Sequence, residues 1–366
     1  MGKEAEGAHA RRAAPSRVPW RDLRLLIIGA GSIGTRHLVN AQALGVARIA
    51  VCDVDGGRRR SATGRGVETF PSLETALRAG GYDAALVCTP SAMHVRHARA
   101  AAGAGADLFL EKPLSHTATG VPQLLAFCHA RGRRVMMGMC YRFHPGLARM
   151  RRLLKSGFIG RLYAAQFSAG HYLPDWHPWA DYRQEYSARR DLGGGVLLDS
   201  IHSLDTVRWF FGEAAEVQST VARLSDLEID TEDLVACIIC LKNGMVVELH
   251  EDYLQRAKRS RLVVIGSEGT LEWDGSRNSF RVYTASTAQW RRFRYRFAVN
   301  DMYRAELRYF LGCVVGGETP MPDGKDGWRT LQLALWVRSA KRQRSSEPVA
   351  LLRTASRHAR RGRQAV

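Results

Sequence analysis

A glycine-rich segment near the start of the chain, LLIIGAGSIGTRH, has the first residue pattern with recognisable chemistry. Its glycines follow a GxGxxG spacing, directly after an apolar run that predicts a strand and at the start of a predicted helix. Such a turn brings backbone close to a pyrophosphate and points a helix N-terminus at the phosphates. The pattern predicts binding of a nicotinamide dinucleotide, and the alternative is a glycine-rich turn without a ligand. The contacts expected here are Gly29, Gly31, Ser32, Ile33 and Gly34.

The choice between NAD and NADP depends on the end of the next predicted strand. Asp53 stands there, nineteen residues after Gly34. A carboxylate at this place accepts hydrogen bonds from the adenosine ribose hydroxyls and repels a 2′-phosphate, which favours NAD. The run from Arg58 to Arg60 points the other way, because an arginine can hold that phosphate. We therefore expect NAD, with NADP as the alternative.

The elements that position these residues alternate between strand and helix. Predicted strands are separated by amphipathic or alanine-rich segments, which is typical of a parallel sheet with helices on both faces. Beyond Tyr141 the rhythm changes to a helix over 145–157, a strand, an irregular aromatic stretch and a helix over 203–212. A run of strands from Glu216 to about Phe297 follows, and two helices over 301–317 and 326–343 close the chain. The predicted strands of the first region are residues 23–29, 47–53, 83–89, 106–112 and 134–139.

The fold class predicted from this pattern is α/β. It consists of an N-terminal Rossmann doubly wound parallel sheet and a C-terminal α+β domain with a large, mostly antiparallel open sheet. We expect a disordered basic leader over 1–22, the Rossmann domain over 23–141, the substrate and oligomerisation domain over 142–351, and a basic tail over 352–366. The last helix is also a candidate to pack back on the Rossmann domain.

Three further segments resemble one known family. LFLEKPLS contains Glu111, Lys112 and Pro113 after a predicted strand, with CTPSAMHVRHA before it and GGGVLLDSIHSLDTVRWFFG after it. These segments resemble the glucose-fructose oxidoreductase and inositol dehydrogenase family (Gfo/Idh/MocA), over about Leu23 to about Leu351. The resemblance implies that Lys112 touches the nicotinamide end and the substrate hydroxyl, and that Asp199 and His202 complete the site.

The segment HYLPDWHPWADYRQEYSARRDLGGG also resembles a subgroup often associated with surface-glycan and amino-sugar biosynthesis. One feature departs from the family. Only Ser200 and Ile201 separate Asp199 from His202, where many members have three residues between them.

The chemistry implied is the oxidation of a secondary alcohol, or its reverse. A hydride leaves carbon while the hydroxyl proton leaves for a base, and a histidine with an ordinary pKa of about 6.5 suits that step. His202 is the expected base. Lys112 is expected to stabilise developing alkoxide charge, and Asp199 to orient the pair.

Other candidates surround this centre. Tyr141 and Arg142 follow a strand at the sheet edge where open α/β folds place ligands, so they are expected to contact the substrate or the nicotinamide ribose. A polar and aromatic cluster downstream, which includes His177, either recognises a sugar or packs as a loop. No metal is expected, since no carboxylate or cysteine spacing supports one. Expected cofactor contacts also include Thr89, Pro90, His94, Glu111 and Lys112, and expected substrate contacts His171, Trp176, Tyr182 and Arg183.

Composition limits the remaining classes. With 366 residues, 45% hydrophobic and 24% charged, the chain suits two globular domains. No apolar run approaches the ~20 residues of a membrane span, and the start of the chain lacks the apolar core of a secretory signal, so we expect a cytoplasmic protein. The seven cysteines do not suggest a disulfide framework, and Cys237 and Cys240 are expected to be buried strand residues. The net charge of +19 lies partly in the tail, where it either attracts polyanions or reflects composition alone.

The function predicted is an NAD-dependent oxidoreductase acting on a secondary hydroxyl or ketone of a sugar, nucleotide sugar or cyclitol. The resemblance also implies a homodimer or homotetramer joined through the open sheet faces. One alternative function is an enzyme with another net chemistry, such as imine reduction or recycling of a tightly held cofactor. The other is a catalytically silent dinucleotide-binding sensor. Nucleic-acid binding through the tail is not expected, because no helix-turn-helix or RNA-binding motif accompanies it.

Overall fold

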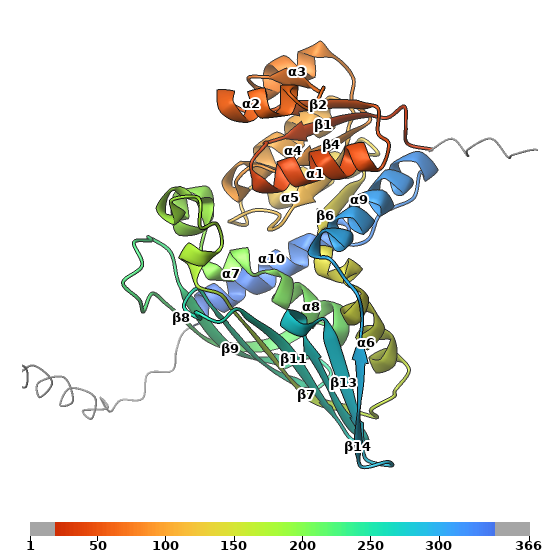
Figure 1. Ribbon diagram of the computed structural model, residues 1–366, viewed down its shortest axis with the longest axis vertical. Helices are drawn as coiled ribbons and strands as arrows, with labels where there is room; N and C mark the ends of the chain where they lie inside the picture. Colours follow the sequence, from red (N-terminus) through yellow and green to blue (C-terminus); the bar gives the residue numbers. More distant parts are fainter. Residues whose placement is uncertain (1–18, 341–366) are drawn as a thin grey trace, which may run out of the picture.

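The computed structural model describes residues 19–340. The expected basic tail, and all but the last four residues of the expected leader, lie outside this range. Two β-sheets with their helices make up the described chain, one above the other in Figure 1. The predicted fold class is confirmed.

The first sheet is fully parallel, with strand order β3-β2-β1-β4-β5-β6. This is the doubly wound order in which ligands bind at the carboxyl ends of the strands. All five strands predicted for this region are present, and the sixth, β3, has only three residues and so gives no pattern to recognise. The strands are β1 Arg24–Ile28, β2 Arg48–Cys52, β3 Glu68–Phe70, β4 Ala84–Val87, β5 Asp107–Glu111 and β6 Val135–Gly138.

Helices cover both faces of this sheet (Figure 1). The central strands are buried throughout, and neighbouring residues such as Leu25 and Leu26 pack into cores on opposite faces. The helices α1 to α5 connect the strands. They are α1 Ser32–Ala43, α2 Gly56–Thr63, α3 Leu73–Ala79, α4 His94–Gly103 and α5 Val121–Ala130.

The second sheet has eight strands in the order β14-β13-β12-β11-β7-β10-β9-β8. Only the pair β7–β10 is parallel. Alternate residues of β9 are buried, as expected for a sheet with one covered face. The strands are β7 Leu162–Gly170, β8 Ala214–Ala222, β9 Leu234–Leu241, β10 Val246–Asp252, β11 Arg259–Gly266, β12 Gly269–Asp274, β13 Ser279–Thr284 and β14 Gln289–Arg294.

Helices on the side toward the first domain cover one face of the second sheet, and its other face is bare in the described chain (Figure 1). The bare face carries Ile238, Val246 and Ile265, each more than a third exposed. The helices are α6 Pro145–Lys155, α7 Val196–Asp199, α8 His202–Phe211, α9 Val299–Gly316 and α10 Gly324–Ser339. Short 3-10 helices are η1 Ser91–Met93, η2 Cys140–Phe143, η3 Leu173–Asp175, η4 Tyr182–Gln184, η5 Tyr186–Ala188, η6 Arg190–Leu192 and η7 Gly275–Arg277.

The end of the described chain returns to the first domain. Helix α9 packs on α1 and places Leu307 and Phe310 in the core of the parallel sheet. Helix α10 contacts β6 as well as α8 and β8, and the Met137 backbone amide donates to the Pro322 carbonyl at 2.9 Å. These contacts tie both sheets together around the carboxyl ends of the parallel strands.

No helix of the described residues is long and apolar enough to cross a membrane. Between residues 19 and 340 no group of three or more metal-ligating side chains gathers to hold an ion. All seven cysteines are free. Cys237 is buried and Cys240 is half-buried, and their separation of three residues places them on opposite faces of β9, so they cannot share one metal ion.

Candidate functional site

The glycine-rich turn has the shape that a dinucleotide needs. Gly29 has φ +94°, which favours glycine, and a Cβ on Gly34 would collide with the Gly29 carbonyl oxygen. Gly31 is different, because the nearest atom to a Cβ there is Arg58 Nη1 at 4.0 Å. Gly31 precedes α1, and no side chain caps this helix. The space above Gly31 and the uncapped amides at Ser32 and Ile33 therefore fit a pyrophosphate.

Asp53 is held beside this turn at the end of β2. Its Oδ2 accepts from the Ala30 amide at 2.6 Å and its Oδ1 accepts from the Asp55 amide at 2.8 Å. Arg58 Nη1 lies 3.7 Å from Asp53 Oδ2, while Arg59 turns back to the Asp53 and Val54 carbonyls. The adenosine end of the groove thus has one fixed carboxylate and one exposed guanidinium.

The predicted groove residues after β4 and β5 divide into two groups. Thr89 approaches Gly29 closely and, with Pro90, borders the turn. His94 is buried, with Nε2 2.7 Å from the Thr89 carbonyl and Nδ1 2.8 Å from the Pro113 carbonyl. Glu111 is also buried, with Oε1 2.7 Å from His37 Nε2. His94 and Glu111 therefore support the groove from behind.

Lys112 and Asp199 form the centre of the site, where the first domain meets the second. Lys112 Nζ donates to Asp199 Oδ1 at 2.9 Å and to the Asp199 carbonyl at 2.7 Å. The Lys112 side chain is 18% exposed and that of Asp199 only 3%. Burial alone would lower the pKa of Lys112, but Asp199 and Tyr186 hold it well above its usual value. Lys112 is therefore a fixed ammonium.

Asp199 is saturated with donors. Besides Lys112, Oδ1 accepts from the Tyr186 hydroxyl, and Oδ2 accepts from Ser187 at 2.6 Å and Tyr253 at 3.1 Å. Burial would raise its pKa, but the Lys112 charge and these hydroxyls keep the pKa below the usual value. The carboxylate is ionised and has no room for a substrate proton, so its geometry suits it to hold Lys112 in place.

His202 begins α8 beside this pair. Its ring stacks on Tyr141 with centroids 4.7 Å apart, and Cys140 Sγ lies 3.7 Å from Nε2. Nδ1 is buried and has no hydrogen-bond partner among the described residues. Burial, and next the Lys112 charge, lower the pKa of His202 to about 3, well below the value near 6.5 expected from sequence. The imidazole is therefore neutral, and one of its ring nitrogens has no hydrogen-bond partner in the described chain.

Four side chains of this centre did not emerge from the sequence. Tyr186 and Ser187 lie in η5, within the quoted segment before the glycine triplet, but no spacing rule singles them out. Tyr253 follows β10 in a segment without a motif, and Cys140 precedes the predicted Tyr141. The signal that could find them is tertiary, because they come together only when both domains are assembled.

Arg142, a predicted substrate contact, is bound by two carboxylates. Its guanidinium forms a bidentate pair with Asp205, at 2.7 and 2.9 Å, and also contacts Asp326 at 2.6 Å. Arg208 also contacts Asp326, a residue of α10, at 3.1 Å. Arg142 is only 10% exposed, so this network, which links η2, α8 and α10, fully occupies it.

The aromatic cluster is only partly at the site. His171 and Trp176 stack with centroids 5.9 Å apart, and Trp176 also packs edge-on against Tyr253, the donor to Asp199. Tyr182 instead accepts from the Glu228 amide, and Arg183 pairs with Asp181 and Glu228. His177 lies 4.0 Å from Glu185. The structure thus connects His171 and Trp176 to the centre, and directs Tyr182, Arg183 and His177 to other partners.

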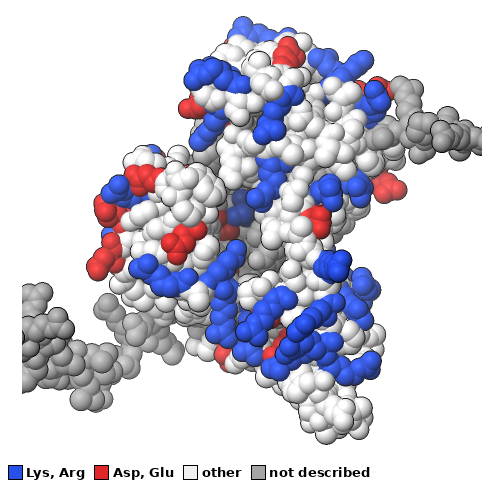
Figure 2. Space-filling view, in the orientation of Figure 1, with Lys and Arg blue, Asp and Glu red and all other residues white. Residues whose placement is uncertain are grey.

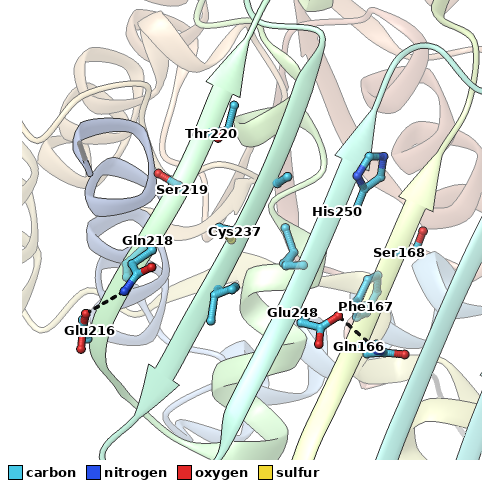
Figure 3. Close-up of a pocket in the computed structure, with 14 residues that line it drawn as sticks. Gln166, Phe167, Ser168, Glu216, Gln218, Ser219, Thr220, Cys237, Glu248 and His250 are labelled. Carbon is cyan, nitrogen blue, oxygen red and sulfur yellow. Dashed lines mark hydrogen bonds between the residues drawn. The ribbon is translucent and has the colours of Figure 1, made fainter. Parts of the chain in front are cut away.

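One hollow on the surface of the described chain lies away from this centre. It measures about 990 Å³ and lies on the bare face of the second sheet, over β7 to β10. Figure 3 shows Gln166 paired with Glu248, and Gln218 with Glu216, along this wall. None of the proposed reacting groups lines it, so this hollow is not the proposed reaction site.

Comparisons with known proteins agree with this geometry. Residues 23–139 match a family model described as an oxidoreductase family with NAD-binding Rossmann fold, and residues 147–272 match the GFO/IDH/MocA C-terminal domain. Myo-inositol 2-dehydrogenase of Thermotoga maritima is 28% identical, covering 88% of this chain and 98% of that protein. A dTDP-3,4-didehydro-2,6-dideoxy-alpha-D-glucose 3-reductase of Streptomyces antibioticus is 30% identical, covering 70% and 77%.

A solved levoglucosan dehydrogenase in complex with NADH and levoglucosan has the same fold. Its TM-score is 0.79 at 18% identity, with 87% of this chain and 97% of that chain covered. The family models together cover most of the described residues, and they meet at the Lys112–Asp199 pair. The chain belongs to the Gfo/Idh/MocA oxidoreductase family and is an NAD(P)-dependent dehydrogenase acting on CH–OH groups.

Proposed function

We propose that the protein transfers a hydride between NAD and a secondary hydroxyl or ketone of a sugar, nucleotide sugar or cyclitol. The observation that carries this proposal is the buried Lys112–Asp199 ion pair at the end of β5, next to a neutral His202 with an unpaired ring nitrogen. When bound, the nicotinamide supplies the hydride acceptor or donor.

Each residue of the centre has a distinct role in this proposal. Lys112 donates a hydrogen bond to the reacting oxygen and stabilises its negative charge as the C–H bond breaks. His202 accepts the hydroxyl proton, and returns it in the reductive direction. Asp199 positions Lys112, because its oxygens are already occupied by four side-chain donors.

NAD is the proposed cofactor because Asp53 is fixed where the adenosine ribose would lie. Two backbone amides hold its carboxylate in place, so the carboxylate would stay close to a 2′-phosphate of NADP and repel it. The exposed Arg58 next to it is the feature that would support NADP. The Asp53 carboxylate is held by more hydrogen bonds than the Arg58 guanidinium, and we propose that it determines the preference for NAD over NADP.

The substrate class follows from the surroundings and from relatives. His171 and Trp176 give a stacked aromatic wall beside Tyr253, which suits the apolar face of a sugar or cyclitol ring. Named relatives act on myo-inositol and on a dTDP-linked hexose. We therefore place the reacting ring between this wall and Lys112.

A spectrophotometric assay at 340 nm tests the proposal, with NAD or NADP and a panel of cyclitols, free sugars and nucleotide sugars. Lys112→Met should reduce kcat by about 10²- to 10³-fold, as for loss of a transition-state donor, while NAD still binds. Lys155→Met, on the far end of α6, serves as the control for loss of a lysine. Tight NAD binding without turnover of any panel member in either direction would support a dinucleotide sensor instead.

We also propose that copies of the chain associate through the bare face of the second sheet. Its exposed Ile238, Val246 and Ile265 lie on β9, β10 and β11, on the face that no described element covers. Light scattering after gel filtration should give a dimer or tetramer. Ile238→Glu should shift that mass toward the monomer, and an unchanged mass would argue against this interface.

A further inference from the structure

The loop between β10 and β11, residues 253–258, begins at a partner of Asp199 in the centre of the site. We name it the rim loop. At its start, the Tyr253 hydroxyl donates to Asp199, and just after its end Ser260 lies beside Tyr141, the ring that stacks on His202. The rim loop therefore lies between two residues that contact side chains of the reacting centre.

The rim loop has an ordered backbone. Asp252 accepts from the Leu254 and Gln255 amides at 2.8 Å each, and from the Gln255 side chain at 2.6 Å. The Gln255 carbonyl in turn accepts from the Tyr172 amide at 2.7 Å. The loop is thus built into the strand ends, and its side chains project from a defined position.

Two cations of the rim loop lack an acidic partner. Arg256 places its guanidinium carbon 3.5 Å from the centroid of Tyr172, a neutral ring, and Lys258 is exposed near His171. Neither cation forms an ion pair with any residue between 19 and 340. Asp175 is the acidic residue that, like Lys258, lies near His171. Elsewhere many arginines of this chain do pair, as Arg183 does with Asp181.

The next basic residue, Arg259, points to the other face of the sheet. It is the first residue of β11, in which Leu262 and Val264 face the covered side. Because side chains alternate along a strand, Ser260 faces the centre and Arg259 faces the bare side. The three basic residues are close in sequence, but only Arg256 and Lys258 belong to the rim loop beside the aromatic wall.

Figure 2 shows Lys and Arg side chains bordering the hollow between the two domains, with few Asp or Glu among them. Unpaired cations at the mouth of a cleft raise the local concentration of anionic ligands. An arginine held flat on an aromatic ring keeps its edge N–H donors free, and those donors match the oxygens of a phosphate.

We infer that Arg256 and Lys258 form a subsite for a phosphate group on the substrate, next to the His171–Trp176 wall. This inference rests on the proposed function, and it narrows the substrate to a phosphorylated sugar or cyclitol or a nucleoside diphosphate sugar. The ring reacts at Lys112 and His202, and the phosphate lies at the rim. A neutral free sugar leaves this subsite empty.

The test begins with binding rather than turnover. Protein saturated with NADH, so that the dinucleotide groove is filled, is titrated with inorganic pyrophosphate by calorimetry. The double variant Arg256→Ala/Lys258→Ala should bind pyrophosphate at least about tenfold more weakly than the wild type, which is about 1.4 kcal/mol. Arg259→Ala is the matched control and should stay within about twofold. Equal binding by the double variant and the wild type overturns the subsite.

Kinetics then separate the sources of the phosphate. With a UDP-sugar and with a sugar 1-phosphate, the double variant should raise KM at least about tenfold at nearly constant kcat. A rise for both identifies the phosphate itself, and a rise for the UDP-sugar alone assigns the subsite to nucleoside diphosphate sugars. A neutral cyclitol with the best kcat/KM, unaffected by the variants, overturns the inference but leaves the dehydrogenase intact. Specific pyrophosphate binding without any turnover supports the subsite and contradicts the proposed reaction.

Discussion

Tyr141 lies flat against His202, with ring centroids 4.7 Å apart and planes 11° apart. Tyr141 comes from η2 after β6, and His202 begins α8, so the stack joins the two domains at the proposed base. Because a misplaced catalytic group loses rate steeply, Tyr141→Ala should lower kcat by about tenfold or more, while Tyr141→Phe keeps the stack and most of the rate. Steady-state kinetics of both variants check this, and equal losses would show that the ring is not the positioning element.

The protonation states of Lys112 and His202 predict the pH profile. Burial and the Lys112 charge lower the pKa of His202 to about 3, and Asp199 keeps the pKa of Lys112 well above its usual value. Neither group changes protonation in the free enzyme between about pH 5 and pH 9. We expect kcat/KM to show no inflection near pH 6.5 over that range. An inflection there in the wild type would mean that His202 is solvated.

A partly buried and a buried histidine also predict how stability depends on pH. Burial lowers the pKa of His97 and of His144 to about 4. The unfolded chain takes up these protons near pH 6.5, so it binds more protons than the folded chain below that pH. The free energy of unfolding should therefore fall as the pH falls from about 6.5 to about 4. Urea unfolding at pH 7.5 and pH 5.5 should show less loss for His97→Gln than for the wild type or the exposed control His129→Gln.

Most of the fold can be predicted from the sequence because each strand and helix has a local pattern of apolar residues. Buried parallel strands such as β1 and β5 are continuous apolar runs, and the glycine turn has a spacing that few other structures require. Strand β3 is missed because three residues at a sheet edge have no period. The bounds of α6, α8, α9 and α10 agree with the predicted helices to within a few residues.

The site is harder to predict because its contacts are not local. Lys112 and Asp199 are 87 residues apart, and only a family resemblance brings them together in the sequence. Tyr253 has no motif, yet its hydroxyl meets Asp199. Arg142 also follows a strand end, but Asp205 and Asp326, which are distant in sequence, already bind its guanidinium. A favourable position at a strand end therefore does not show by itself which partner a side chain will bind.

The position of Arg142 leads to a prediction that separates stability from substrate binding. Removing one partner of a buried ion pair leaves an uncompensated charge and costs about 3–5 kcal/mol. Arg142→Leu should lower the free energy of unfolding by about that amount and leave KM for the sugar nearly unchanged in the folded fraction. Denaturant unfolding and kinetics check both. Arg149→Leu is the control, because the Arg149 guanidinium lies over Phe293 on the second sheet. If Arg142→Leu raised KM without lowering stability, Arg142 would be a substrate contact.

Cofactor choice can be reversed at Asp53 if the carboxylate sets it. In Asp53→Ser the negative charge next to Arg58 is gone, so the guanidinium 3.7 Å away can bind a 2′-phosphate. The ratio of kcat/KM for NAD to that for NADP should fall by at least about tenfold. Asp55→Ser is the control, because a serine still caps α2 and the residue pairs with backbone amides of its own helix. If Asp55→Ser moves the ratio as far as Asp53→Ser does, the preference comes from the overall charge of this edge and not from the ribose contact.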